Sequence, residues 1–248
     1  MTPMADEKQL LKLVFGDSSD SEIEDSLYDD DVCHQDSDQS SPSWEPNDVI
    51  NGLWLCRNFL SPQQQTTLLS AVQNEGWFAD GSNNQAMRFG ELPSWAVELS
   101  CTIGGAVLSG AHICEPTHSM CSEKELPSLF PSELFSREPL FDQLIVNVYQ
   151  PGEGICAHVD LMRFEDGIAI VSLESPCVMH FTPAAEDQPL KVIPVHLTPG
   201  SLVLLSGEAR YLWMHEINRK PGFQVWEGRE LSQQRRTSIT LRKLCCSE

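Results

Sequence analysis

The chain has 248 residues, of which 41% are hydrophobic, and a formal net charge of −20. This length fits one domain with a tail, no apolar run is long enough to cross a bilayer, and no secretory signal opens the sequence. The acidic balance disfavours a protein that binds nucleic acid through a broadly basic face, and nine cysteines without a C-x-x-C pair argue against a zinc site. Reduced thiols indicate the nucleus or the cytoplasm.

The first 46 residues are predicted to form a disordered acidic tail. They hold 13 acidic against 2 basic residues and cannot bury enough apolar surface to fold. The favoured interpretation is a solubilising leader. The alternative is an arm for a protein partner, with Ser18, Ser19 and Ser21 as phosphorylation sites beside acids. Residues 47–248, with 23 acidic against 14 basic residues, form the predicted folded domain.

Order is predicted to begin with a strand near 49–55, where apolar residues become frequent. A helix then begins at Ser61, which has the sequence of a capping box: Pro62 stands at the first helical position and Gln64 three residues after the cap. Gly76 is placed to end this helix.

A second helix is predicted from Pro93, with Trp95, Leu99 and Ile103 on one face. Between the two helices, residues 83–90 read as a polar loop that contains an aromatic residue and an arginine. Residues 115–140 contain several Pro and Ser and are predicted to be mostly loop.

From residue 141 the pattern becomes that of a β protein. Short strands separated by turn signals favour a double-sheet jelly roll, a double-stranded β-helix that holds ligands in its mouth. The fold class is therefore mainly β with flanking helices. The predicted strands are 144–149, 168–173, 178–181, 191–197, 201–205, 211–214 and 237–241.

Two histidines and one carboxylate form a candidate metal site. His158 and Asp160 are two residues apart after a Pro-Gly turn, so on an extended strand both side chains point the same way. With a third ligand they would make the two-histidine, one-carboxylate triad of non-haem Fe(II) oxygenases. His215 is the first candidate for the third ligand, and two further histidines remain rivals: His180 and His196. The same His-x-Asp spacing at His34 lies in the predicted tail, where nothing would hold a rigid site.

Arg236 and Arg242 stand six residues apart on the last predicted strand. An even spacing puts both on one face, where two guanidinium groups can hold a dicarboxylic acid. A straight strand would separate them by roughly 20 Å, however. The simpler interpretation, two surface arginines, is slightly favoured by the residues alone.

The stretch 141–243 resembles the AlkB-like family of Fe(II)- and 2-oxoglutarate-dependent dioxygenases, most of all the oxygenase domain of the tRNA wobble-uridine hydroxylase branch. The resemblance is carried by an Asn-x-Tyr strand, the His-x-Asp pair, the segment ending in the distal histidine, and the closing Arg-x5-Arg. In this chain these motifs are Asn147–Tyr149, His158–Asp160, Gly207–His215 and Arg236–Arg242. Residues 85–90 resemble the family's substrate-facing lid more loosely. The resemblance places the oxygenase core at about 139–246.

The resemblance implies a role for each position. His158, Asp160 and His215 would bind Fe(II). Arg236 would pair with the far carboxylate of 2-oxoglutarate and Arg242 with the end nearer iron, while Asn147 and Tyr149 would hydrogen-bond the same co-substrate. With O2, such a site hydroxylates an alkyl group, and a hydroxylated N-methyl group is lost as formaldehyde.

Three functions follow as hypotheses. The first is oxidation of a modified nucleobase, in RNA rather than DNA. The second is the same chemistry on a protein side chain, because the surface is acidic and the RNA-binding and methyltransferase domains of the wobble-uridine relatives are missing here. The third is a non-catalytic interaction protein. A departure from the family is Glu216 beside His215, where a carboxylate at the metal mouth would repel phosphate. We expect a monomer in the nucleus, the cytoplasm or both.

Overall fold

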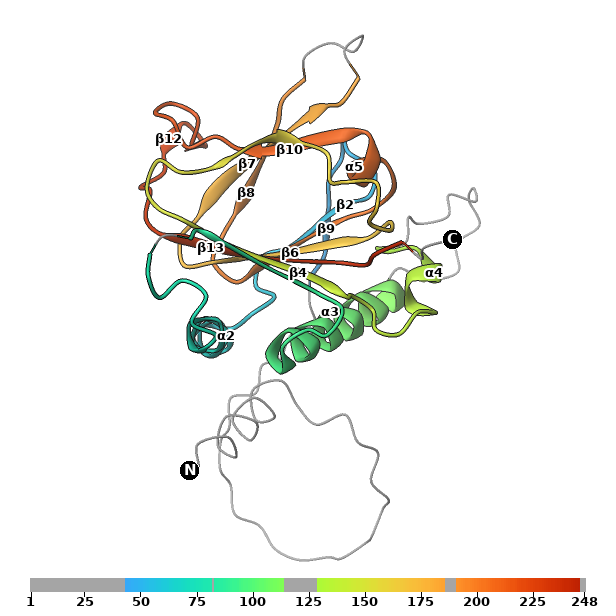
Figure 1. The fold of residues 1–248 in the computed structure, drawn as a ribbon. Helices are drawn as coiled ribbons and strands as arrows, with labels where there is room; N and C mark the ends of the chain where they lie inside the picture. The colour runs from blue at the N-terminus through green and yellow to red at the C-terminus, as the bar shows by residue number, and fades with distance from the viewer. Residues whose placement is uncertain (1–42, 82, 114–128, 186–190, 246–248) are drawn as a thin grey trace, which may run out of the picture. The chain divides into compact units, whose positions relative to one another are not determined.

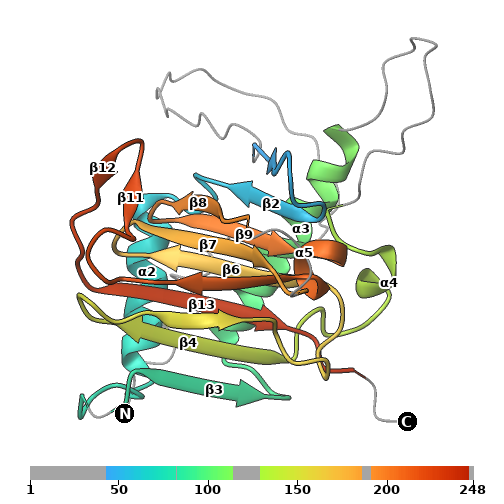
Figure 2. The same ribbon diagram turned by 90° about the horizontal axis from the view of Figure 1, so that it is seen from above.

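The computed structural model describes residues 43–81, 83–113, 129–185 and 191–245. Within these ranges two antiparallel sheets face each other, and two helices cover the outer face of the larger sheet (Figures 1 and 2). The predicted double-sheet jelly roll is confirmed. The predicted disordered tail lies outside the described residues except for its last four.

The larger sheet has seven strands in the order β1-β2-β9-β6-β13-β4-β3, each pair antiparallel. Strands that lie side by side in this sheet are mostly distant in the sequence, because the connections between them cross over other strands. The strands are β1 (Glu45–Pro46), β2 (Leu53–Cys56), β9 (Ser201–Leu205), β6 (Ile168–Leu173), β13 (Arg236–Arg242), β4 (Gln143–Tyr149) and β3 (Gln85–Phe89).

The smaller sheet has four antiparallel strands in the order β5-β10-β7-β8. They are β5 (Ile155–His158), β10 (Trp213–Ile217), β7 (Cys177–Pro183) and β8 (Ile193–Leu197). A separate hairpin pairs β11 (Val225–Trp226) with β12 (Arg229–Glu230).

An apolar core fills one half of the space between the sheets. Alternation along the strands puts one side chain in two toward the opposite sheet. The buried core comes from β2, β6 and β9 on one side and β7 and β8 on the other, and includes Leu53, Leu55, Ile168, Ile170, Val203, Leu205, Met179, Phe181 and Leu197. Polar side chains occupy the other half, beside β13 and β4, and this is where the site forms.

The two predicted helices are α2 (Pro62–Asn74) and α3 (Ser94–Ile113). The Ser61 hydroxyl accepts from the Gln64 amide, and the Gln64 side chain accepts from the Ser61 amide, so the capping box is complete. Gly76 follows the helix with φ +70, the left-handed conformation that suits glycine. Trp95, Leu99 and Ile103 are buried on one face of α3, as predicted. None of the described helices is long and apolar enough to span a membrane.

The predicted polar loop over 83–90 is wrong, because its centre is the edge strand β3, paired with β4 over five residues. This strand lacks β-branched residues and is mostly exposed, so tertiary pairing rather than local propensity makes it a strand. Of the predicted loop over 115–140, only 129–140 is described, and it contains the short helix α4 (Ser132–Phe135). The predicted strand at 211–214 begins later, because the helical turn α5 (Gly207–Tyr211) precedes β10. Glu45 and Pro46, placed in the tail by composition, pair with β2.

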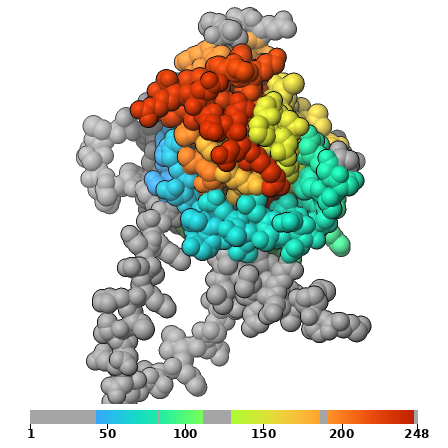
Figure 3. Space-filling model, turned by 90° about the vertical axis from the view of Figure 1, so that its left-hand side faces the viewer, coloured from blue at the N-terminus to red at the C-terminus, as the bar shows by residue number. Residues whose placement is uncertain are grey.

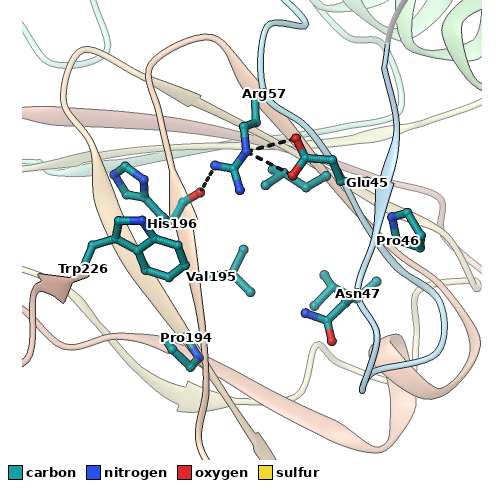
Figure 4. Close-up of a pocket in the computed structure, with 10 residues that line it drawn as sticks. Glu45, Pro46, Asn47, Arg57, Pro194, Val195, His196 and Trp226 are labelled. Carbon is teal, nitrogen blue, oxygen red and sulfur yellow. Dashed lines mark hydrogen bonds and ion pairs between the residues drawn. The ribbon is translucent and has the colours of Figure 1, made fainter. Parts of the chain in front are cut away.

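A small cavity lies between β1 and β8, the edge strands of the larger and the smaller sheet (Figure 4). Arg57 closes it, donating to Glu45 from Nε and to the His196 carbonyl from Nη1. The stacked rings of His196 and Trp226, with centroids 5.2 Å apart, form one wall. These contacts join the free edges of the two sheets.

Candidate active site

The ligating atoms of His158, Asp160 and His215 all lie within 4.8 Å of one another. His158 ends β5 and lies directly opposite His215 in β10, with ring centroids 4.3 Å apart. The sequence predicts Asp160 on the same extended strand as His158, but β5 ends at His158 and Asp160 lies just beyond it. The Asp160 side chain still reaches the two rings. The three groups could hold a metal ion.

The atoms around the cluster fit a cation. His158 Nδ1 lies 2.8 Å from the Cys156 carbonyl, and a proton on Nδ1 leaves Nε2 as the metal ligand. Asp160 Oδ2 is buried without a hydrogen-bond partner among the described residues, 3.8 Å from His215 Nε2. A buried carboxylate oxygen left in this state is costly, and a bound metal ion would satisfy it.

His215 is kept neutral by its surroundings. Burial lowers the pKa of His215 to about 4, with Asp160 acting in the opposite direction and His158 adding to the decrease. A neutral imidazole is the form that binds metals. The ring is therefore available as a ligand at pH 7 without losing a proton first.

The rival histidines lie elsewhere. His180 is paired with Glu216 across β7 and β10, on the face of the smaller sheet opposite His215. His196 stacks on Trp226 at the cavity between β1 and β8. The same alternation turns Glu216 away from the metal cluster, so this carboxylate does not lie on the His215 face of the sheet, beside the metal ligands, as its position in the sequence had suggested.

The two arginines occupy opposite ends of β13 on its inward face. The Arg242 guanidinium pairs with the Asp160 carboxylate, so this end of β13 lies at the metal cluster. Arg236 is 1% exposed and donates from Nε to Ser172 Oγ at 3.1 Å. Both are buried, and the interpretation as surface arginines is wrong.

The terminal nitrogens of Arg236, Nη1 and Nη2, are buried and have no hydrogen-bond partner among the described residues. The guanidinium carbon lies 5.6 Å from the centre of the Tyr149 ring. A buried guanidinium with both outer nitrogens open is suited to grip a carboxylate with two parallel hydrogen bonds.

Asn147 and Tyr149 of β4 lie opposite Ser238 and Arg236 of β13. Together with the two arginines they form a row of polar side chains along β13 and β4. Asn147 Oδ1 accepts from Gln85 Nε2 at 2.7 Å, which orients the amide. Burial raises the pKa of Tyr149, with Arg236 opposing it, so the phenol stays protonated at neutral pH and can donate a hydrogen bond. Figure 3 shows the face of the molecule on which the surfaces of 75–81 and 83–90 (teal), the β4–β5 turn (yellow-green) and 218–235 (red) adjoin.

Sequence reasoning missed three buried supports of the site. Ser172 on β6 holds Arg236, and Gln143 on β4 accepts from Arg242 Nη1 at 3.4 Å. Arg210 of α5 donates to three carbonyls of the segment 160–164, the first of which is that of Asp160 itself. Their partners lie 46 to 99 positions away in the chain, so no local pattern could have found them.

A family model described as the 2OG-Fe(II) oxygenase superfamily matches residues 52–242. Among curated relatives, tRNA (carboxymethyluridine(34)-5-O)-methyltransferase ALKBH8 of Macaca fascicularis is 37% identical over 80% of this chain and 31% of its own length. The Xenopus tropicalis alkbh8 methyltransferase of the same name is 30% identical over 82% and 32%. The Alkylated DNA repair protein ALKBH8 homolog of Arabidopsis thaliana is 32% identical over 79% and 59%. The chain thus spans about a third to three fifths of these relatives.

Among solved structures, the one titled OsALKBH1 aligns with a TM-score of 0.56 at 16% identity, over 79% of this chain and 99% of that one. This likeness shows a shared fold. Together with the family match, it confirms the predicted AlkB-like resemblance. The chain therefore belongs to the 2OG-Fe(II) oxygenase superfamily, which implies Fe(II), 2-oxoglutarate and O2 as its cofactors.

Proposed function

We propose that this chain is a Fe(II)- and 2-oxoglutarate-dependent dioxygenase that hydroxylates or oxidatively demethylates a modified nucleobase in RNA. The observation that carries the chemistry is a single buried row with a metal-ligating cluster at one end of β13 and an open guanidinium at the other. When bound, the iron would use O2 and 2-oxoglutarate to oxidise a carbon–hydrogen bond, releasing succinate and CO2.

Each residue of the row has a proposed task. His158, Asp160 and His215 hold the metal. Arg236 takes the far carboxylate of 2-oxoglutarate, and Arg242, already paired with Asp160, lies beside the end nearer the metal. Asn147 and the protonated Tyr149 hydrogen-bond the same molecule. An extended diacid between the two arginines resolves their separation along the strand.

The mouth of the site supports a flat substrate. Gln85, Met87 and Phe89 share the inward face of β3 next to Asn147 and Ile145 of β4, and Met87 and Phe89 are each 46% exposed. The Arg163 guanidinium lies 5.4 Å from the centre of the Phe89 ring. Aromatic rings and stacked guanidinium groups are the surfaces on which unpaired bases stack. The names of the ALKBH8 relatives, which concern tRNA uridine and alkylated DNA, also favour a nucleobase.

The substrate class is tested with short single-stranded RNA and DNA oligonucleotides that carry methylated bases or modified uridines. Each is incubated with Fe(II), 2-oxoglutarate and the protein, and its nucleosides are analysed by mass spectrometry. We expect one modified RNA nucleoside to gain an oxygen or lose a methyl group, and Asp160→Ala to abolish the change. A panel left intact by a protein that does turn over 2-oxoglutarate would contradict the nucleobase assignment.

The second candidate is the same chemistry on a protein side chain. It is favoured by charge, because residues 47–248 hold 23 acidic against 14 basic residues. A domain of net negative charge would repel the phosphate backbone of a nucleic acid. Basic peptides that stimulate succinate formation, where no oligonucleotide does, would support it. Stimulation by oligonucleotides alone would rule it out.

A further inference from the structure

Arg210 is a buried cation that contacts the backbone of the metal-binding segment. It is 1% exposed and lies on α5, five residues before His215. Its Nη1 donates to the Asp160 carbonyl at 2.9 Å, and its Nη2 donates to the carbonyls of Leu161 at 2.7 Å and Phe164 at 3.3 Å. One guanidinium thus holds three carbonyls within five residues, beginning at a proposed metal ligand.

The segment held in this way also reaches the mouth of the site. The Phe164 amide donates to the Leu161 carbonyl at 3.1 Å, which closes a turn over 161–164. On this turn Leu161 and Met162 are 60% and 64% exposed, and Arg163 stacks over Phe89 of β3. Arg210 therefore touches the backbone of both the Asp160 ligand and the turn beside the substrate mouth.

A second contact keeps α5 in place against the same segment. The Asp166 carboxylate accepts from the Gly207 amide at the start of α5, at 2.9 Å and 3.1 Å. Arg210 makes its contacts near the other end of α5. α5 leads directly into β10 and His215. Its contacts with the 160–166 segment therefore join the segments of two of the three proposed ligands, Asp160 and His215.

We propose that Arg210 is a positioning residue of the metal centre, which holds the Asp160 backbone so that its carboxylate meets the two histidines, and which fixes the 161–164 turn at the substrate mouth. The inference rests on the metal site of the proposed function, but not on the identity of the substrate. Partners outside the ligand set commonly change metal affinity by tenfold to a hundredfold, which sets the scale of the expected effect.

The alternative is that Arg210 only stabilises the fold, and the chain offers a matched control for that. Arg219 is also buried, at 3% exposure, and also donates to three acceptors: the Gln150 and Gln234 carbonyls and Gln233 Oε1. None of its partners lies in the 160–164 segment. Arg219→Met should therefore lower stability as Arg210→Met does without loosening the metal ligands.

The test is Co(II) titration of the folded protein, monitored by visible absorption, without 2-oxoglutarate or nucleic acid. Wild type, Asp160→Ala, Arg210→Met, Arg210→Lys and Arg219→Met are compared below the lowest of their melting temperatures. We expect Arg210→Met to bind Co(II) about tenfold to a hundredfold more weakly, with an altered spectrum. Arg210→Lys should fall between Arg210→Met and wild type, because an ammonium on a flexible stem cannot hold three carbonyls as the guanidinium fork does. Arg219→Met should bind as wild type.

Wild-type affinity and an unchanged spectrum in Arg210→Met would overturn the inference, as would an equal loss of affinity in Arg219→Met, which would show a general effect of destabilisation. Wild-type binding that Asp160→Ala does not weaken would overturn the metal site itself, and the inference with it. That outcome differs visibly from a failure of Arg210 alone, and neither depends on whether RNA is the substrate.

Discussion

At the scale of single residues, Arg236 is the group whose environment most clearly requires a ligand. Its guanidinium is almost fully buried and donates from Nε to the Ser172 hydroxyl, yet no carboxylate of the described residues pairs with it. Burying an uncompensated charge costs several kcal/mol. A carboxylate bound to Nη1 and Nη2 would remove most of that cost, which makes Arg236 the expected determinant of co-substrate affinity.

We expect Arg236→Lys to raise the KM for 2-oxoglutarate by about 10- to 100-fold, since each hydrogen bond to a charged group contributes about 1.5–3 kcal/mol. The measurement is succinate formation against 2-oxoglutarate concentration. Arg235→Lys is the neighbouring control, because Arg235 is half exposed and pairs with Glu174. An unchanged KM in Arg236→Lys would remove Arg236 from the co-substrate site.

Sequence reasoning at this scale worked where the chemistry is local. The His158–Asp160 pair was visible because both residues contribute to one cluster from positions only two apart in the chain. The choice of His215 over His180 and His196 depended on resemblance, because strand register, which puts His215 opposite His158, cannot be read from a single strand. Gln85, which orients Asn147, stood in a segment predicted to be a loop.

At the scale of elements, α2 is held at its start by the reciprocal bonds of Ser61 and Gln64. Ser61→Ala should destabilise the protein by about 1 kcal/mol. In a domain of this size that corresponds to a fall in Tm of roughly 2–4 °C. Ser70→Ala is the control in the same helix, because Ser70 is exposed and its hydroxyl donates back to the Thr66 carbonyl; there we expect little change. Equal effects would show that the cap contributes nothing specific.

The contact between β8 and β11 should give the protein a pH-dependent stability. Burial, then Arg57, lowers the pKa of His196 below its usual 6.5, with Glu227 opposing. The folded state therefore binds this proton less readily than the unfolded state, so stability is complete above about 6.5 and is lost as the pH falls.

We expect His196→Gln to reduce the decrease in unfolding free energy between pH 7.5 and 5.5, measured by urea denaturation. The decrease should not vanish, because burial also lowers the pKa of His180 and that of His215. A decrease as large as that of wild type would contradict the assignment.

The elements that sequence predicted best are those whose own residues decide their state. The strands in 144–149, 168–173 and 201–205 are apolar and buried, and both long helices carry their start signals. β3 and β1 escaped prediction because each becomes a strand only by pairing with an existing sheet edge. α5 escaped because a single helical turn leaves no periodic pattern.

At the scale of the whole molecule, the site lies across both sheets. His158 and His215 belong to the smaller sheet, and the polar row of β13 and β4 belongs to the larger one. The Asp160–Arg242 ion pair already joins the two. Metal and co-substrate should therefore stabilise the folded domain as a whole rather than one loop.

We expect Co(II) with 2-oxoglutarate, each at about a hundred times its Kd, to raise the stability by about 2.7 kcal/mol for each ligand. This predicts an increase in Tm of several degrees. Adding a chelator should return the Tm to that of the metal-free protein, and Asp160→Ala should show no shift. A Tm that rises equally in Asp160→Ala would mean that the ions bind elsewhere.

The fold class was predictable, because short strands in which apolar and polar residues alternate can bury their apolar faces in only a few arrangements. Strand order was not, since the larger sheet joins β9, β6, β13 and β4, which are far apart in the chain. The position of the site at the junction of the sheets followed from this order.

The most direct test of the central claim is succinate formation from 2-oxoglutarate by the Fe(II)-loaded protein. The control is the Asp160→Ala variant, which we expect to bind no metal. We predict slow succinate release by wild type alone, stimulated by one modified RNA oligonucleotide and lost in the variant. No succinate from a folded, metal-loaded wild type, or equal release by Asp160→Ala, would contradict the account.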